Sequence, residues 1–103
     1  MPDLVIRLKY DNEILLSADE KHVQVLDNKY YIHPDLVELS RFEVSDRIYN
    51  CPSKGKARWV DLRTEKGWLN DICWVIPDPK PKYIQIAGWF GFTPGNKHYE
   101  IET

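Results

Sequence analysis

The 103-residue sequence lacks the clustered cysteines and histidines that hold a structural metal ion. Its two cysteines, Cys51 and Cys73, lie in separate segments without a C-x-x-C pair, and its three histidines are scattered. A structural zinc site needs four such ligands, most often in closely spaced pairs. We therefore expect a protein that folds without metal and uses no cofactor.

The sequence also lacks a long hydrophobic run. No segment approaches the roughly 20 apolar residues of a membrane-spanning helix, and charges interrupt the N-terminal segment, so no signal peptide is expected. With a formal net charge of −2, the chain has no overall attraction to nucleic acid or to an anionic membrane. We expect a cytoplasmic protein with reduced thiols that binds neither nucleic acid nor membranes.

Aromatic residues are abundant, with four tryptophans, six tyrosines and three phenylalanines. Flat rings suit the pleated surface of strands. Alternating stretches such as L-V-I-R-L-K-Y at residues 4–10 are separated by turn residues. Such spacing predicts an all-β domain of about eight or nine strands. At most one or two short helical turns are expected, over residues 35–38 and 82–86.

The whole chain, residues 1–103, is long enough for one domain with a single core. The N-terminal third predicts a meander of short antiparallel strands. A turn at residues 65–67 is expected to pair the strands that carry Trp59 and Trp74. The last aromatic strand is predicted over residues 87–93.

One stretch gathers the most reactive side chains: residues 49–59 read Y-N-C-P-S-K-G-K-A-R-W. A nearby ammonium lowers the pKa of a thiol and raises its thiolate fraction, so Cys51, close to Lys54, is the candidate catalytic nucleophile. The alternative is that Cys51 is a buried, inert thiol. Cys73 lies between Ile72 and Trp74 on a predicted strand, and we expect it in the core.

The Lys54–Gly55 step and three tryptophans are candidate ligand contacts. Glycine lets the backbone approach a ligand, and successive N–H groups in a tight turn attract anions. Trp59, Trp74 and Trp89 are candidate walls of an aromatic pocket. The alternatives are a solubilising turn and rings that pack in the core.

Three segments together resemble the family called domain of unknown function 427, which is also named nucleotidyltransferase-like. They run from Y-D-N-E-I-L-L-S-A-D to Y-Y-I-H-P-D-L-V, through C-P-S-K-G-K-A-R-W, and from C-W-V-I-P-D-P to I-A-G-W-F-G-F. The resemblance implies a β-tent fold, in which two small antiparallel sheets pack at an angle. Relatives by fold include methionine-R-sulfoxide reductases and the drug-binding domain of cereblon. Many of them carry a four-cysteine zinc site, which this sequence lacks.

Function is less constrained than fold. We expect the domain to bind a small anionic or aromatic ligand in a cleft near the C-P-S-K-G loop. One alternative is an enzyme with Cys51 as nucleophile, although no two-metal or Walker-type motif for nucleotide transfer is present. Another is a protein-interaction module that uses a sheet face or edge, which exposed Trp89 or Phe92 would favour. A homodimer is compatible with the sequence.

Overall fold

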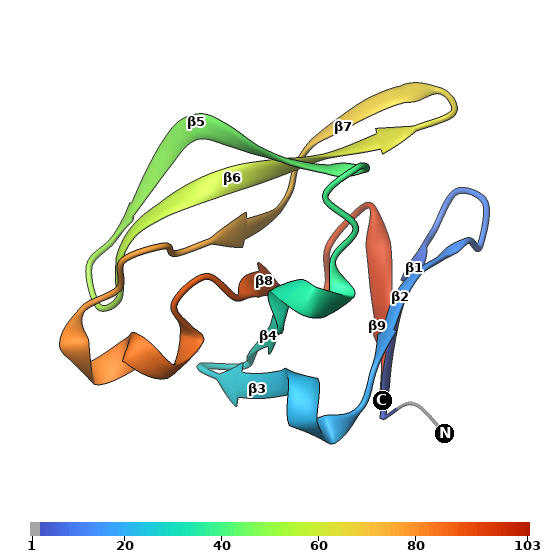
Figure 1. Ribbon diagram of the computed structural model, residues 1–103. Coiled ribbons are helices and arrows are strands. Elements are labelled where there is room, and N and C mark those ends of the chain that lie inside the picture. The colour runs from blue at the N-terminus through green and yellow to red at the C-terminus, as the bar shows by residue number, and fades with distance from the viewer. Residues whose placement is uncertain (1–2) are drawn as a thin grey trace.

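The computed structural model describes residues 3–103 as two antiparallel sheets connected by turns (Figure 1). The smaller sheet has the strand order β2–β1–β9 and the larger one β3–β4–β8–β7–β6–β5. The strands are β1 (Leu4–Leu8), β2 (Ile14–Ala18), β3 (Val23–Leu26), β4 (Lys29–Ile32), β5 (Phe42–Cys51), β6 (Gly55–Thr64), β7 (Gly67–Val75), β8 (Phe90–Phe92) and β9 (Tyr99–Glu102). The all-β, two-sheet fold predicted from the sequence is confirmed.

Helical structure in the described residues consists of three short 3-10 segments. These are η1 (Glu20–His22), η2 (Pro34–Leu36) and η3 (Pro81–Ile86). The sequence predicted helical turns near η2 and η3 but not near η1. None of these segments has the length and apolar character that crossing a bilayer requires.

The prediction of a single N-terminal meander is wrong. β1 pairs with β2, and β3 pairs with β4, but the two pairs belong to different sheets. η1 lies between β2 and β3, where the chain passes from one sheet to the other (Figure 1). Apolar alternation identifies a strand but not its partner, so the sequence pattern did not reveal this change of sheet.

The last aromatic strand is shorter than predicted, because its first half forms turns. The amide of Ala87 donates to the carbonyl of Ile84 at 3.1 Å, and the amide of Trp89 donates to that of Ile86 at 2.9 Å. Gly88 between them has a φ of +77°, which glycine adopts without strain. Backbone groups used in turns cannot join a ladder, so β8 begins only at Phe90.

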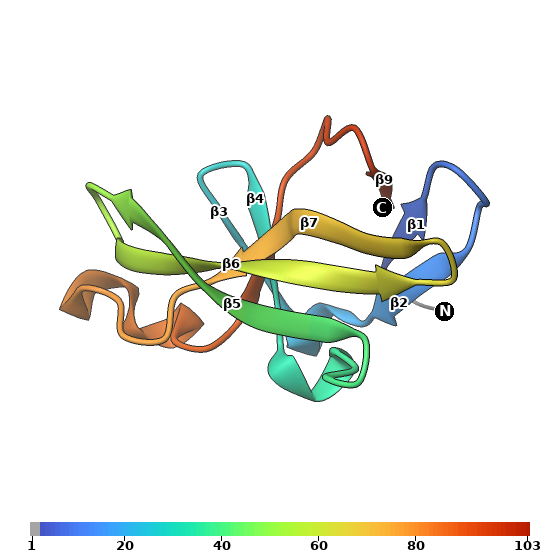
Figure 2. The same cartoon turned by 90° about the horizontal axis from the view of Figure 1, so that it is seen from above.

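The long strands β5, β6 and β7 of the larger sheet extend from one end of the molecule toward the other. The turn between β6 and β7 lies near β1 and β2 (Figure 1). The turn between β5 and β6, at the opposite end, lies near η3 (Figures 1 and 2). Val60 and Leu62 of β6 are fully buried in the main core, whereas Ala57, nearer the other end, belongs to a second apolar cluster with Ile76 and Ile86. The strand β6 therefore contributes side chains to two apolar regions.

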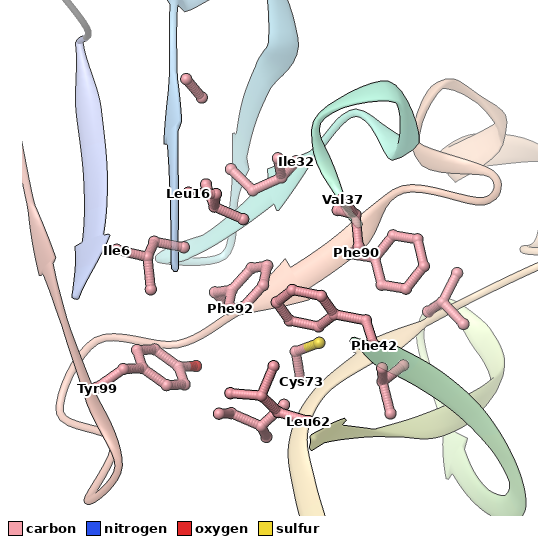
Figure 3. Close-up of a cluster of buried hydrophobic side chains, with 14 of the residues drawn as sticks. Ile6, Leu16, Ile32, Val37, Phe42, Leu62, Cys73, Phe90, Phe92 and Tyr99 are labelled. Carbon is pink, nitrogen blue, oxygen red and sulfur yellow. The ribbon is translucent and has the colours of Figure 1, made fainter. Parts of the chain in front are cut away.

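The main core lies between the two sheets (Figure 3). Its aromatic centre is Phe92, whose ring packs edge-to-face against Phe42 and Tyr99 at centroid distances of 6.4 and 5.5 Å. This is the geometry that aromatic pairs favour. Cys73 is fully buried in the same core, which confirms its predicted placement.

Replacing Phe92 by alanine is expected to lower the free energy of unfolding by about 3–5 kcal/mol, because the lost ring leaves a void in the core. Trp68→Ala is the matched control, since Trp68 is 51% exposed, and it should cost less than about 1 kcal/mol. Chemical denaturation measures both values. Similar losses for the two variants would contradict this placement of the core.

Candidate functional site

A cavity of about 390 Å³ lies on one face of the larger sheet, and we call it the aromatic cavity. Its aromatic lining residues are Tyr31, Tyr49, Trp59 and Trp74. Its polar lining residues are Asp27, Lys29, Cys51, Lys54 and Thr93, and Ala57 and Ile76 complete it. This volume falls within the range of about 300–1,000 Å³ that is usual for small-molecule sites.

A row of directly opposed residues crosses the sheet at the base of the aromatic cavity. Trp59 of β6 pairs with Trp74 of β7, Trp74 pairs with Gly91 of β8, and Gly91 pairs with Tyr31 of β4. Directly opposed residues share one face of a sheet. The pairing of the strands that carry Trp59 and Trp74, predicted from the turn between them, is confirmed, and the two residues are directly opposed.

Gly91 is the residue of this row that sequence reasoning missed. A Cβ atom at this position would lie 2.7 Å from Cζ2 of Trp74, closer than non-bonded atoms approach. The indole therefore lies over the backbone of β8, in space that any side chain at position 91 would occupy. The signal was a glycine between two phenylalanines in a strand, since such a glycine often marks a close approach.

The ring of Trp74 stands nearly at right angles to two neighbouring rings of the aromatic cavity. Trp74 packs edge-to-face against Tyr31 at 6.1 Å and 85°, and against Trp59 at 6.3 Å and 82°. Tyr49 tilts against Trp59 at 5.8 Å. Perpendicular neighbours offer a flat guest a ring face on one side and a ring edge on the next, both favourable contacts for a π-system.

Cys51 ends β5 and lines the aromatic cavity, with its sulfur 3.4 Å from the hydroxyl of Ser53. Burial acts to raise the pKa of this thiol, but hydrogen bonds from Ser53 and from the backbone of Lys54, together with the Lys54 charge, hold the pKa below its ordinary value. Burial raises the pKa of Cys73 well above its ordinary value. Only Cys51 combines access with an increased thiolate fraction.

Lys54 lines the aromatic cavity but is 6% exposed, and its ammonium forms an ion pair with Asp27. The ammonium also lies 5.0 Å from the ring centroid of Tyr83. Burial acts to lower the pKa of Lys54, yet the hydrogen bond to Asp27 and nearby negative groups raise it, so the lysine stays charged. Its charge is therefore largely compensated within the protein.

The ion pair between Lys54 and Asp27 joins two turns that are far apart in the sheet. Lys54 lies in the turn between β5 and β6, and Asp27 lies in the turn between β3 and β4. β5 and β3 are the two edge strands of the larger sheet. The pair therefore connects opposite sides of the sheet across the aromatic cavity.

Lys29 is a second lysine of the cavity, and the sequence did not single it out. Its ammonium donates to the Thr93 hydroxyl at 3.1 Å and forms no ion pair with residues 3–103. The sequence pattern marked Lys29 only as part of a turn. Its position two residues before Tyr31 places both side chains on one face of β4, but which face borders a cavity is not visible in a sequence.

Two predicted ligand contacts lie outside the lining of the aromatic cavity. Gly55 faces the backbone of Asp78 and Pro79 and has a φ of +120°, which glycine adopts without strain. Trp89 packs against His33 at a ring-centroid distance of 5.0 Å and borders the second apolar cluster. Cys51, Lys54, Trp59 and Trp74, by contrast, converge on one volume.

A family model described as Domain of unknown function (DUF427) matches residues 4–103. The chain belongs to this family. No curated protein sequence matches the chain. Within residues 3–103, the DUF427 domain has no group of three or more His, Cys, Asp or Glu side chains placed to hold a metal ion.

We expect Cys51 of the DUF427 domain to be alkylated by iodoacetamide much faster than Cys73 in the native protein. The rate should rise with pH at a midpoint below that of an ordinary thiol, because hydrogen bonds stabilise the Cys51 thiolate. Ser53→Ala should move that midpoint to higher pH, with a smaller shift in Lys54→Met. Peptide mass spectrometry resolves the two sites, and equal slow labelling would mark Cys51 as inert.

The ion pair between Lys54 and Asp27 should make stability depend on acid pH. The hydrogen bond from Lys54 lowers the pKa of Asp27, so the pair stabilises the DUF427 domain above the unfolded carboxyl pKa of about 3.9 and loses this effect as the pH falls through the lower folded value. Asp27→Asn should therefore lower the Tm at pH 7 and change it little at acid pH below the folded pKa of Asp27, where the protonated aspartic acid is as neutral as asparagine.

The matched control for this prediction is Asp46→Asn. Asp46 is exposed on β5 and forms no ion pair with a described residue. Its replacement should leave the Tm nearly unchanged at both pH values. A drop at pH 7 as large as that of Asp27→Asn would indicate a general charge effect instead of the specific pair.

Proposed function

We propose that this DUF427 domain binds a small, flat ligand with aromatic character and a negative charge in the aromatic cavity. The observation that carries the proposal is the convergence of Cys51, Lys54, Trp59 and Trp74 on one volume. These residues come from different strands and turns. Packing of a core does not require that a thiol, an ammonium and two indoles border the same opening.

The shape of the site favours a flat guest. Trp59 and Trp74 are only partly buried, whereas Tyr31 is 2% exposed and closes one side. A planar ring that enters between them gains apolar burial and stacking, and an aromatic pair contributes about 0.5–1.5 kcal/mol beyond its buried area. A sugar needs many hydrogen-bonding groups, which these apolar walls do not supply.

The charge of the lining favours an anion. The ion pair with Asp27 largely compensates Lys54, and the ammonium of Lys29 remains as a further positive group. An aromatic box without such lysines suits cations, but here a cationic guest would be repelled. A single negative charge on the ligand would match the remaining positive charge.

An enzyme that uses Cys51 as nucleophile is the second candidate function. It is favoured by the place of Cys51 in the lining and by the direction of its pKa shift. A guest in the aromatic cavity would lie beside the sulfur. The interaction module is favoured less, because Phe92 is fully buried and Trp89 is partly buried.

A thermal-shift screen of flat aromatic anions tests the binding proposal. A ligand at 100 times its Kd stabilises the native state by about 2.7 kcal/mol, which raises the Tm of a domain of this size by roughly 10 °C or more. Trp59→Ala should abolish the shift, because it removes one wall of the aromatic cavity. Trp68→Ala, which removes an exposed indole outside the lining, should retain it.

The same screen includes neutral and cationic flat compounds as comparison sets. The proposal predicts that anions give the largest shifts. If no flat compound moves the transition at millimolar concentration, or if Trp59→Ala and Trp68→Ala respond alike, the aromatic cavity is not a binding site.

A further inference from the structure

The hydroxyl of Tyr31 interacts with the indole N–H of Trp74, but it donates to no acceptor among the described residues, although Tyr31 is 2% exposed. Every fully buried side-chain nitrogen or oxygen in residues 3–103 does have a partner. Tyr31 lines the aromatic cavity, so its O–H group is a donor that a ligand there can use. A nearly buried donor without an acceptor in the protein is uncommon.

The surroundings of this hydroxyl are those of the aromatic cavity. Burial raises the pKa of Tyr31, Trp74 and Lys54 partly offset this rise, and the negative groups of Cys51 and Asp27 add to it. All four of these residues line the aromatic cavity. The hydroxyl therefore lies near several groups that border the aromatic cavity.

Lys29 projects from the same face of the same strand. Residues two apart on a strand are separated by about 6.6 Å along its axis. The ammonium of Lys29 has three N–H donors, and the structure shows one of them bonded to the hydroxyl of Thr93. β4 thus presents a hydroxyl and a charged donor side by side.

We propose that the ligand is a flat aromatic carboxylate whose carboxylate group is bound by Lys29 and Tyr31, while the ring stacks between the indoles of Trp59 and Trp74. This inference rests on the proposed function and adds the chemical class and the anchor. A carboxylate has two acceptor oxygens that can reach two donors on neighbouring positions. Hydrogen bonds to an ionised group are about twice as strong as neutral ones.

Other anchors and other anions fit less well. Lys54 is already paired with Asp27 and stacked near Tyr83, so it offers less to a ligand. A phosphate monoester carries about −1.5 to −2 charges at neutral pH. Beside one uncompensated ammonium and one neutral hydroxyl, that second charge would remain without a partner. A carboxylate carries the single charge that the site matches.

Isothermal titration calorimetry with 2-naphthoate and its neutral analogue 2-naphthamide tests the inference. We expect the carboxylate to bind roughly tenfold or more tightly than the amide, the size of one charge-assisted hydrogen bond. Lys29→Met should abolish this preference. Tyr31→Phe should weaken both probes, because the amide carbonyl also accepts from the hydroxyl. Lys9→Met, which removes a lysine outside the lining of the aromatic cavity, should retain the preference.

The variants also report on stability. Tyr31→Phe should change the Tm of the unliganded protein only slightly, because the hydroxyl donates to no acceptor in the protein and the variant loses only its contact with the Trp74 indole. A large fall in Tm would mean that the hydroxyl donates to an internal acceptor, and would overturn the inference.

The two proposals fail in different ways. If 2-naphthoate binds and its preference over 2-naphthamide survives in Lys29→Met, or is lost in Lys9→Met, the assigned anchor is wrong but the aromatic cavity still binds flat anions. The anchor is also wrong if Tyr31→Phe leaves both affinities unchanged. If neither probe binds the unmodified protein at millimolar concentration, the proposed function fails and the inference falls with it.

Discussion

The contact between the indole of Trp74 and the backbone of Gly91 is the constraint on which the aromatic cavity depends. A side chain at position 91 would overlap the indole, and the ring would have to leave its place between Tyr31 and Trp59. Because Gly91 pairs with both Tyr31 and Trp74, one missing side chain sets the positions of rings on three neighbouring strands. The edge-to-face packing of those rings follows from this spacing.

The larger sheet borders the main core toward one end and the aromatic cavity toward the other. Near the smaller sheet, β6 buries Val60 and Leu62 in the main core, and the dense packing there leaves no room for a ligand. Toward the other end, the same strand places Ala57 and Trp59 beside the aromatic cavity. The two cysteines illustrate the difference. The thiol of Cys73 is buried and its pKa is raised, whereas the thiol of Cys51 borders the cavity and has a lowered pKa.

Ion pairing in the folded protein separates Lys54 from Lys29 in a way that the sequence did not show. Lys54 stood out in the sequence because it lies in a glycine turn close to a cysteine. In the folded protein it is buried, and it joins two turns through Asp27. Lys29, which looked like an ordinary turn residue, keeps a less compensated charge beside the rings. A lysine that pairs within the protein stabilises the site, whereas one without a carboxylate partner remains available to a ligand.

Local patterns in the sequence determined the strands, most of the turns, the burial of Cys73 and the pairing of the strands that carry Trp59 and Trp74. These features depend on residues close together in the chain, so alternation and turn chemistry are sufficient to predict them. Only the tertiary structure decided which strands share a sheet, that Asp27 meets Lys54, and that Lys29 and Tyr31 face the same cavity as Cys51. Each of these contacts joins distant segments, and a single sequence does not encode such distances in any local pattern.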